Sequence, residues 1–167
     1  MEMVDIVDEE DNVIDTVPKQ QAHDMVLLHR GAAALVFNSK GGILVHKRAS
    51  IKGIYPGFYD MFVGGWVQHG EDYREAAMRE VEEEVGIKDP DLRFLFKHRY
   101  TCEIDDYFVE IFSCIYDGGL KLQEDEVAEA YFVTIDQLEG MFKTKEFCPD
   151  SLEIFNEYKR RKEKGIL

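Results

Sequence analysis

The sequence predicts an α/β sandwich, in which helices cover a sheet of strands. Short segments rich in β-branched and aromatic residues occupy the first third of the chain and recur after residue 90, which is typical of strands. One long helix-forming segment lies between Gly70 and Gly86, and two more helical segments follow the last strand. This order of strands, helix, strands and helices favours a layered α/β fold.

The first part of the chain contains four predicted strands. Residues 3–7 and 13–17 alternate apolar and polar side chains around the turn DEEDN, so they predict an N-terminal β-hairpin. Residues 18–29 are expected to be helical or irregular and to lead into the core. Strands are expected at 31–37 and 43–48, because the glycine-rich turn NSKGG joins them.

The central helix follows a loop at 49–57 and a glycine-interrupted strand at 58–67. Glu71 and Asp72 are expected in its first turn, where the helix dipole favours anions, and Gly86 lies where a helix usually ends. The rest of the chain predicts strands at 93–103, 107–116 and 130–134, then helices at 135–143 and 151–164, the last capped by Asp150 or Ser151.

Length and composition indicate one soluble globular domain. The chain has 167 residues, of which 45% are hydrophobic and 32% charged, which is ordinary for such a domain. We expect a single domain over 1–167, with the hairpin and its lead-in at 1–29, the core at 30–143 and the C-terminal helix at 144–167. The hairpin and the aromatic-rich strands are candidates for the contact surface of a homodimer.

The charge and the cysteines limit the class of partner. A formal net charge of −14 argues against binding nucleic acid polymers through a basic surface, but it permits a small phosphorylated substrate beside a bound metal. No stretch approaches 18 apolar residues, so no membrane association is expected. Three cysteines without CxxC spacing indicate reduced thiols and a cytoplasmic protein, and the acidic N-terminus resembles neither a signal nor a transit peptide.

The carboxylates of the central helix are not equivalent. At about 100° per residue, Glu80, Glu83 and Glu84 share one face, whereas Glu75 and Glu82 fall on the far side. Carboxylates at these spacings repel each other by roughly 0.2–0.5 kcal/mol per pair, and a bridging cation would reverse that effect. Mg²⁺ prefers oxygen ligands and usually takes one or two carboxylates together with phosphate oxygens.

A complete sequence signature surrounds these carboxylates. It consists of Gly65, five residues, Glu71, seven residues, the triplet at 79–81, one residue, Glu83-Glu84, one residue, and Gly86-Ile87. The chain thereby resembles the Nudix hydrolases, from about residue 30 to residue 143. The resemblance implies an α/β/α sandwich with a mixed sheet, and Mg²⁺- or Mn²⁺-dependent hydrolysis of a nucleoside diphosphate linked to another group.

The resemblance also implies roles for individual residues. Its metal ligands would be Glu80, Glu83, Glu84 and the carbonyl of Gly64 or Gly65, and Glu83 could also orient or deprotonate water. Arg79 would fix the carboxylates through Glu71 or Glu83, while Glu71 and Gly86 would be structural. Glu126, in the acidic loop after the later strands, is a further catalytic candidate, although it could be merely solvated. The catalytic set is therefore Glu83, Glu84, Arg79 and Glu126.

A closer resemblance connects the chain with the subgroup that includes isopentenyl-diphosphate isomerase. His29 matches that enzyme and His23 roughly does, but its cysteine and neighbouring histidine are replaced by Gly64 and Trp66, and its glutamate pair maps to Asp105 and Tyr107. The intact hydrolase signature favours a hydrolase of unassigned substrate. The alternatives are an isomerase-like activity and a non-catalytic nucleotide-binding regulator.

Two other groups of residues are open to both functional and structural interpretations. Lys47 and Arg48, at the end of a strand, could contact phosphate, but ordinary strand-end charges are the more common case. Four aromatic residues could stack on a base or simply belong to the core: Tyr59, Phe62, Trp66 and Phe108.

Overall fold

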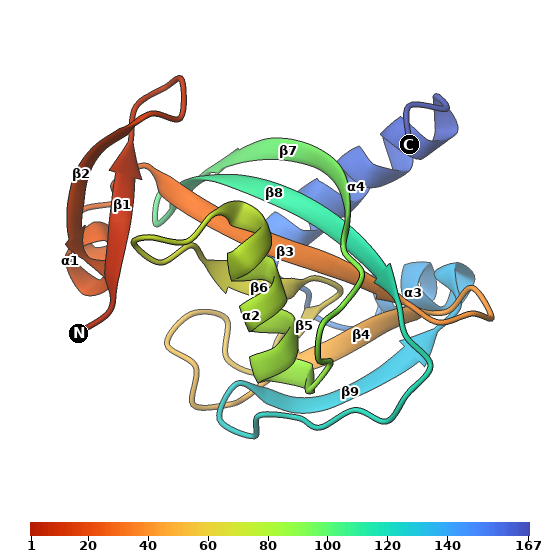
Figure 1. Ribbon diagram of the computed structural model, residues 1–167. Coiled ribbons are helices and arrows are strands. Elements are labelled where there is room, and N and C mark those ends of the chain that lie inside the picture. Colours follow the sequence, from red (N-terminus) through yellow and green to blue (C-terminus); the bar gives the residue numbers. More distant parts are fainter.

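The computed structural model describes residues 1–167 and has the predicted α/β fold with a mixed sheet (Figure 1). Two strands form the N-terminal hairpin: β1 (Met3–Val7) and β2 (Val13–Pro18). A second sheet contains seven strands: β3 (His29–Phe37), β4 (Ile43–Arg48), β5 (Tyr59–Asp60), β6 (Val63–Trp66), β7 (Arg93–Thr101), β8 (Asp106–Ile115) and β9 (Val127–Val133). The helices are α1 (Lys19–Asp24), α2 (Tyr73–Val85), α3 (Ile135–Met141) and α4 (Pro149–Glu163).

Strand β3 is the centre of the large sheet. It pairs in parallel with β8 and antiparallel with β6, whereas its pairing with β4 is limited to Phe37 opposite Ile43. Strand β4 continues antiparallel into β5 and β9. Because β3 and β4 meet only at one end, the two parts of the sheet diverge, and space opens between them at the other end.

Helices cover both faces of the sheet (Figure 1). The alternating side chains of β3 separate the two cores, since Ala32 and Ala34 face α2 whereas Ala33 and Leu35 face the side of α4. Phe155 of α4 is fully buried in the second core. Truncating such a phenylalanine to alanine typically costs about 3–5 kcal/mol, so α4 is an integral layer of the fold.

Several boundaries differ from the sequence-based expectations; the segment at 58–67, for example, forms the two short strands β5 and β6 rather than one. Helix α4 begins at Pro149 after Cys148, and no side chain caps it, so the prediction of an Asp150 or Ser151 cap was wrong. Proline at the first helical position has no N–H that needs a cap. Helix α2 begins at Tyr73, so Glu71 and Asp72 precede its first turn. Strand β9 starts at Val127, three residues before the predicted position.

The N-terminal hairpin is bound to the large sheet through its turn. The Asp11 carboxylate accepts hydrogen bonds from Arg30 Nε (2.7 Å) and from the Tyr73 hydroxyl (2.9 Å), and it forms an ion pair with Lys97. These partners belong to β3, α2 and β7. None of the helices combines the length and apolar character that crossing a membrane requires.

Candidate active site

Helix α2 is fixed at both ends. Asp72 accepts a hydrogen bond from the backbone of Glu75 (2.8 Å), and Glu75 accepts one in return from the backbone of Asp72 (2.9 Å), which forms a capping box. Gly86 ends the helix at φ 76°, in the left-handed region, and a Cβ at this glycine would lie 2.7 Å from Lys121 Cβ. Both the conformation and the lack of space explain why glycine occupies position 86.

The three glutamates on one face of α2 all line the same cavity, whose volume is about 840 Å³. Their burial differs. Glu84 is 7% exposed, the Glu80 side chain is 15% exposed, and the Glu83 side chain is 53% exposed. Glu75 and Glu82 are exposed and do not line the cavity. The helix therefore presents a graded row of carboxylates, from solvent at Glu83 to the interior at Glu84.

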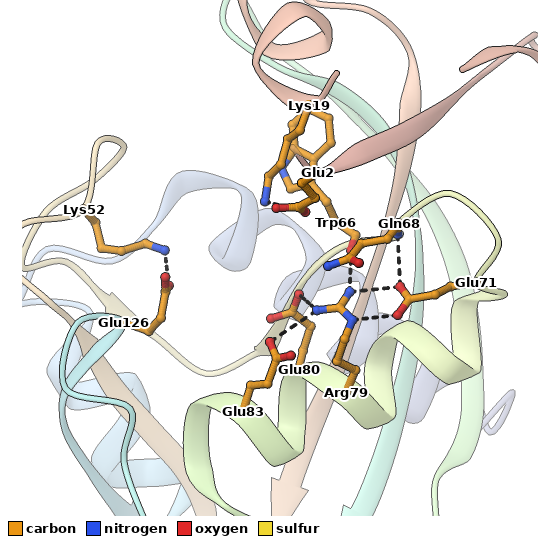
Figure 2. Close-up of polar contacts among 10 residues, drawn as sticks. All are labelled: Glu2, Lys19, Lys52, Trp66, Gln68, Glu71, Arg79, Glu80, Glu83 and Glu126. Carbon is orange, nitrogen blue, oxygen red and sulfur yellow. Dashed lines mark hydrogen bonds and ion pairs between the residues drawn. The ribbon is translucent and has the colours of Figure 1, made fainter. Parts of the chain in front are cut away.

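Arg79 organises the outer part of this row (Figure 2). It donates to both carboxylate oxygens of Glu71, through Nε (2.6 Å) and Nη2 (3.0 Å), and to the backbone oxygen of Trp66 (3.0 Å). Its Nη1 donates to Glu80 Oε1 (2.6 Å) and, at 3.4 Å, to Glu83 Oε2. A planar guanidinium shared by three carboxylates fixes their orientation through charge-assisted hydrogen bonds.

The pKa of Glu71 reflects this arrangement. Burial alone would raise it, but the hydrogen bonds from Arg79 and from the Gln68 backbone hold the pKa below its usual value. Glu71 therefore stays ionised and anchors Arg79 at the start of α2. This geometry agrees with the structural role that the sequence predicts for Glu71.

The paired glycines allow a close approach between β6 and its neighbours. A Cβ on Gly65 would lie 2.5 Å from Glu80 Oε1, and a Cβ on Gly64 would lie 2.2 Å from the backbone oxygen of Ala32. Glu80 therefore lies directly against the Gly65 backbone; a larger residue at position 65 would displace the Glu80 carboxylate, and none fits at position 64, where backbone atoms are in the way. A carboxylate and a strand backbone thus meet beside the cavity.

Glu84 makes this region suitable for a hard cation. Its Oε2 is buried without a hydrogen-bond partner. Burial, followed by the charges of Glu80, Asp60 and Glu126, raises the pKa of Glu84 well above its usual value. No group of three or more histidine, cysteine or acidic side chains is arranged to hold a metal ion, and Arg79 holds Glu80 and Glu83. Mg²⁺ is typically held by one or two carboxylates plus water and phosphate oxygens, so an open carboxylate site fits it.

Glu126 lies across the cavity from α2, where it forms an ion pair with Lys52 (Figure 2). Of the two basic residues suggested from the sequence, Arg48 lines the cavity but donates to the backbone oxygen of Ile54 (3.0 Å). Lys47 does not line it, and its Nζ lies 5.7 Å from the Tyr59 ring centre. The lysines at the cavity are instead Lys52 and Lys19, and sequence analysis did not single out either of them.

The far part of the cavity is built from residues outside the signature. Tyr107 donates to Asp150 Oδ2 (2.7 Å), and the Ser151 hydroxyl donates to Asp60 Oδ1 (2.6 Å). Burial, and then the charge of Asp60, raise the pKa of Asp150. No sequence pattern places Asp60, Asp150 or Ser151 at a cavity, because β5 and the start of α4 meet only through the tertiary fold.

The positions compared with the isomerase converge beside this part of the cavity. The rings of His29 and Trp66 stack at 3.4 Å with an interplanar angle of 5°, and Tyr107 lies 5.5 Å from His29. Asp105 Oδ1 is 3.6 Å from His29 Nε2. His23 also lines the cavity. Burial lowers the pKa of His29 to about 4, so its ring is neutral at pH 7.

The remaining aromatic candidates and the three cysteines are mostly part of the core. Tyr59 and Phe62 are buried core residues, and Phe62 also lines the cavity, whereas Phe108 packs under Lys97 and Arg99 outside it. The three cysteines form no disulfide; Cys114 and Cys148 are buried, whereas Cys102 is only partly buried. Burial raises the pKa of Cys114 to about 11, which makes it an inert thiol.

Comparison with known proteins identifies the family and supports the fold. The model of the NUDIX domain family matches residues 27–157. An uncharacterized Nudix hydrolase of Pseudomonas aeruginosa is 35% identical over 94% of this chain and 93% of its own length. The uncharacterized Nudix hydrolase YfcD of Escherichia coli is 36% identical over 98% of this chain and 90% of its own. The crystal structure of DR0079 from Deinococcus radiodurans is similar in fold, with a TM-score of 0.80 at 23% identity, covering 93% of this chain and 98% of that one.

Proposed function

The chain belongs to the Nudix hydrolase family, and from that premise we propose that it hydrolyses the diphosphate linkage of a small nucleoside diphosphate derivative with Mg²⁺ or Mn²⁺. The observation that carries the proposal is the buried, unpartnered Oε2 of Glu84 in a cavity that Glu80 and Glu83 share. An acceptor oxygen in such a position needs a proton, a cation or a hydrogen-bond donor such as a bound water. We assign the cation to Glu80, Glu83, Glu84 and the carbonyl of Gly65.

The cavity offers separate places for the anion and for the attacking water. Lys52 and Lys19 are its two flexible cations, and each is paired with a carboxylate, Glu126 and Glu2 respectively. We assign both lysines to the substrate phosphates. When Lys52 turns to a phosphate, Glu126 is released toward the reacting water, which gives this glutamate its proposed catalytic role.

The reaction needs one bond made and one bond broken. The oxygen of a water molecule bonds to one phosphorus of the diphosphate, the bond from that phosphorus to the bridging oxygen breaks, and the leaving phosphate keeps its electron pair. A bound divalent cation supplies charge neutralisation and lowers the pKa of water. Glu83, exposed enough to meet water, accepts the proton, while Arg79 keeps Glu83 and Glu80 oriented.

The finer assignments extend this proposal. The replacement of the isomerase cysteine by Gly64, where a Cβ would meet backbone 2.2 Å away, favours an isomerase-like hydrolase over an isomerase. A complete row of cavity carboxylates is more than a non-catalytic nucleotide-binding regulator requires. We also propose one domain over 1–167 and a cytoplasmic location, which three free cysteines support. A homodimer stays a prediction.

The decisive experiment compares Glu83→Gln with Glu82→Gln. The two residues are neighbours of the same type on α2, but only Glu83 lines the cavity. Turnover is measured on nucleoside di- and triphosphates, dinucleotides, nucleotide sugars and prenyl diphosphates, with Mg²⁺ and with Mn²⁺. We expect Glu83→Gln to lose about 10²–10⁴-fold in kcat, the contribution of a positioned general base, and Glu82→Gln to match the wild type. Equal kcat values for both variants would contradict the assignment, and isomer formation from isopentenyl diphosphate would favour the isomerase.

A further inference from the structure

A short segment between β5 and β6 crosses the opening in the large sheet (Figure 1). Strand β5 pairs with β4, whereas β6 pairs with β3, and these two partner strands meet only where Phe37 lies opposite Ile43. Met61 and Phe62 therefore lead the chain from one part of the sheet to the other. Both are buried, and Phe62 lines the cavity. The position of β6 relative to β5 depends on what holds these two residues.

The Phe62 backbone is held by side chains instead of by strand pairing. Neither its N–H nor its carbonyl pairs with another backbone group. Asp60 Oδ1 accepts from the Phe62 N–H at 2.7 Å, and His46 Nε2 lies 2.9 Å from the Phe62 carbonyl oxygen. A carbonyl oxygen only accepts, so Nε2 carries a hydrogen and donates it. Because buried backbone groups need partners, these two side chains replace the pairing that the sheet lacks at this point.

His46 has no other polar contact in the structure. It lies in β4, is 3% exposed and does not line the cavity. Its Nδ1 is buried without a hydrogen-bond partner, so the bond to Phe62 is the one polar interaction that the ring makes. Asp60, on the other side of the Phe62 peptide, is itself fixed by the Ser151 hydroxyl at 2.6 Å. The Phe62 backbone is thus clamped between β4 and the start of α4.

The clamped residue leads directly to the backbone that meets the signature helix. Only Val63 separates Phe62 from Gly64 and Gly65. A Cβ on Gly65 would lie 2.5 Å from Glu80 Oε1, so the carboxylate rests against this backbone. A displacement of β6 would therefore change the contact between Gly65 and Glu80.

We propose that His46 is a positioning residue of the hydrolase site, an inference that rests on the function proposed above. Its hydrogen bond to Phe62 fixes where β6 runs past α2, and thereby holds the Gly65 carbonyl beside Glu80 for the divalent cation. His46 itself touches neither the cation nor the substrate. Groups that orient the direct ligands of a metal typically contribute about 10- to 100-fold to metal affinity or activity. Cation affinity is therefore the property that His46 controls, through the backbone.

Three variants test this role. His46→Leu removes the donor, and His46→Gln keeps an N–H donor that is the same number of bonds from Cβ. Ile43→Ala is the control, because Ile43 lies in the same strand, is fully buried and does not line the cavity, but belongs to the end where β3 and β4 meet. Mn²⁺ binding is measured from the electron paramagnetic resonance signal of the free ion. Turnover of the diphosphate panel is measured against Mn²⁺ concentration, below the temperature at which any variant begins to melt.

We expect His46→Leu to raise both the Mn²⁺ dissociation constant and the Mn²⁺ concentration for half-maximal turnover about tenfold or more. His46→Gln should stay within about threefold of the wild type, because the donor is restored. Ile43→Ala should melt at a lower temperature than the wild type and keep its Mn²⁺ affinity. Amide hydrogen exchange gives a readout that needs no metal: the β6 amides should exchange faster in His46→Leu, but not in His46→Gln.

Three results would overturn the inference: wild-type Mn²⁺ affinity in His46→Leu, equal losses of affinity in His46→Leu and Ile43→Ala, or a His46→Gln variant as weak as His46→Leu. If His46→Leu does not fold, His46→Asn takes its place, since its amide is too short to reach the Phe62 carbonyl. The two hypotheses fail separately. Mn²⁺ binding that depends on His46, without turnover of any diphosphate, contradicts the hydrolase and supports the inference. Turnover with the same Mn²⁺ dependence in the wild type and His46→Leu contradicts the inference alone.

Discussion

Glu84 is the residue at which folding and function make opposite demands. It is 7% exposed, and its Oε2 has no donor within the protein. An isolated buried carboxylate lowers the free energy of unfolding because its charge loses hydration that nothing replaces. A buried charged residue that lowers the free energy of unfolding in this way is commonly one whose partner is a ligand rather than another part of the chain.

The first prediction concerns Glu84→Gln. We expect kcat to fall about 10²-fold or more, since a metal-coordinated carboxylate contributes several kcal/mol to charge stabilisation in the transition state. In chelator at pH 8, the melting temperature should rise by about 2–4 °C, the effect of roughly 1 kcal/mol in a chain of this size. Turnover assays and thermal melts measure the two effects. Glu82→Gln, on the exposed face of α2, is the control and should change neither.

At Gly64, the sequence comparison and the packing both argue against the cysteine that the isomerase has at this position. A Cβ there would lie 2.2 Å from the Ala32 oxygen and 2.5 Å from the Ala33 Cα, both of which belong to the backbone of β3. We predict that Gly64→Cys destabilises the protein by about 1–3 kcal/mol, as overpacking does, and restores no isomerisation of isopentenyl diphosphate.

Urea unfolding and an isomerase assay measure the effects of Gly64→Cys. The control is Gly140→Ala within α3, where a new Cβ meets nothing within 4 Å. That replacement should stabilise the helix by about 0.5–1 kcal/mol. Wild-type stability of Gly64→Cys, or any isomerase activity in it, would contradict the prediction.

The sequence identified the signature residues because their spacing is a property of one helix. Glu80, Glu83 and Glu84 share a face at any location of α2, so their common exposure to the cavity follows from helical geometry alone. His29 and Asp105 are 76 positions apart and meet only because β3 pairs with β8. No local pattern encodes that contact, and the sequence connects the two residues only through the resemblance to the isomerase subgroup.

Among the elements, the N-terminal hairpin is held to the rest of the protein by several contacts, and one cluster of them surrounds Asp11 in its turn. Asp11 adopts φ 64°, in the left-handed region, and its carboxylate is shared by Arg30, Tyr73 and Lys97. The hairpin supplies Glu2 and leads into Lys19 at the cavity. The hairpin therefore carries the segment that leads into one of the two lysines assigned to phosphate.

The third prediction is that Asp11→Asn lowers the free energy of unfolding at pH 7 by about 1–3 kcal/mol, the cost of removing a hydrogen-bonded partly buried charge. Burial would raise the pKa of Asp11, but hydrogen bonds from Lys97, Arg30 and Tyr73 outweigh it, so the pKa is lowered in the folded state. A lowered pKa contributes stability above the unfolded value of about 3.9, and this stability is lost as the pH falls through the folded value.

The difference in unfolding free energy between the wild type and Asp11→Asn should therefore be constant from pH 7 to 5 and shrink below about pH 4. Urea unfolding at a series of pH values measures it. Asp15→Asn is the control, since Asp15 is exposed and its carboxylate accepts only from the backbone of Thr16; it should change stability by less than about 0.5 kcal/mol. A pH-independent effect of Asp11→Asn would contradict the electrostatic account.

The elements themselves were largely predictable, because alternation and turn residues are local signals. The hairpin, the strands on both sides of α2 and the two last helices all occur where the pattern indicates. The predicted cap of α4 was wrong because tertiary contacts took its candidates: Asp150 binds Tyr107, and the Ser151 hydroxyl binds Asp60. A side chain that hydrogen-bonds to another part of the protein cannot also cap a helix, and the sequence alone does not show which distant residue it will bind.

At the scale of the whole molecule, a net charge of −14 and an acidic cavity have the same consequence. Acidic side chains outnumber basic ones around the cavity, and two of the basic ones, Arg79 and Arg48, are already bound to oxygen acceptors. An anionic substrate is repelled from such a region unless cations accompany it. Binding of a divalent cation should therefore relieve repulsion within the folded chain as well as prepare the site.

The last prediction follows from this linkage between cation binding and folding. A ligand that binds only the folded state at about 100 times its dissociation constant adds about 2.7 kcal/mol to the free energy of unfolding. In a chain of this length that corresponds to a rise of about 5–10 °C in melting temperature. We expect millimolar Mg²⁺ or Mn²⁺ to produce such a rise in the wild type and in Glu82→Gln, but not in Glu84→Gln. KCl at equal ionic strength is the control, because it screens the repulsion between surface charges without occupying a specific site. Such screening largely removes interactions between exposed charges that lie more than about one Debye length apart. The same rise in KCl, or in Glu84→Gln with Mg²⁺, would show that the cation acts on the acidic surface rather than at Glu84, and the metal assignment would then be withdrawn.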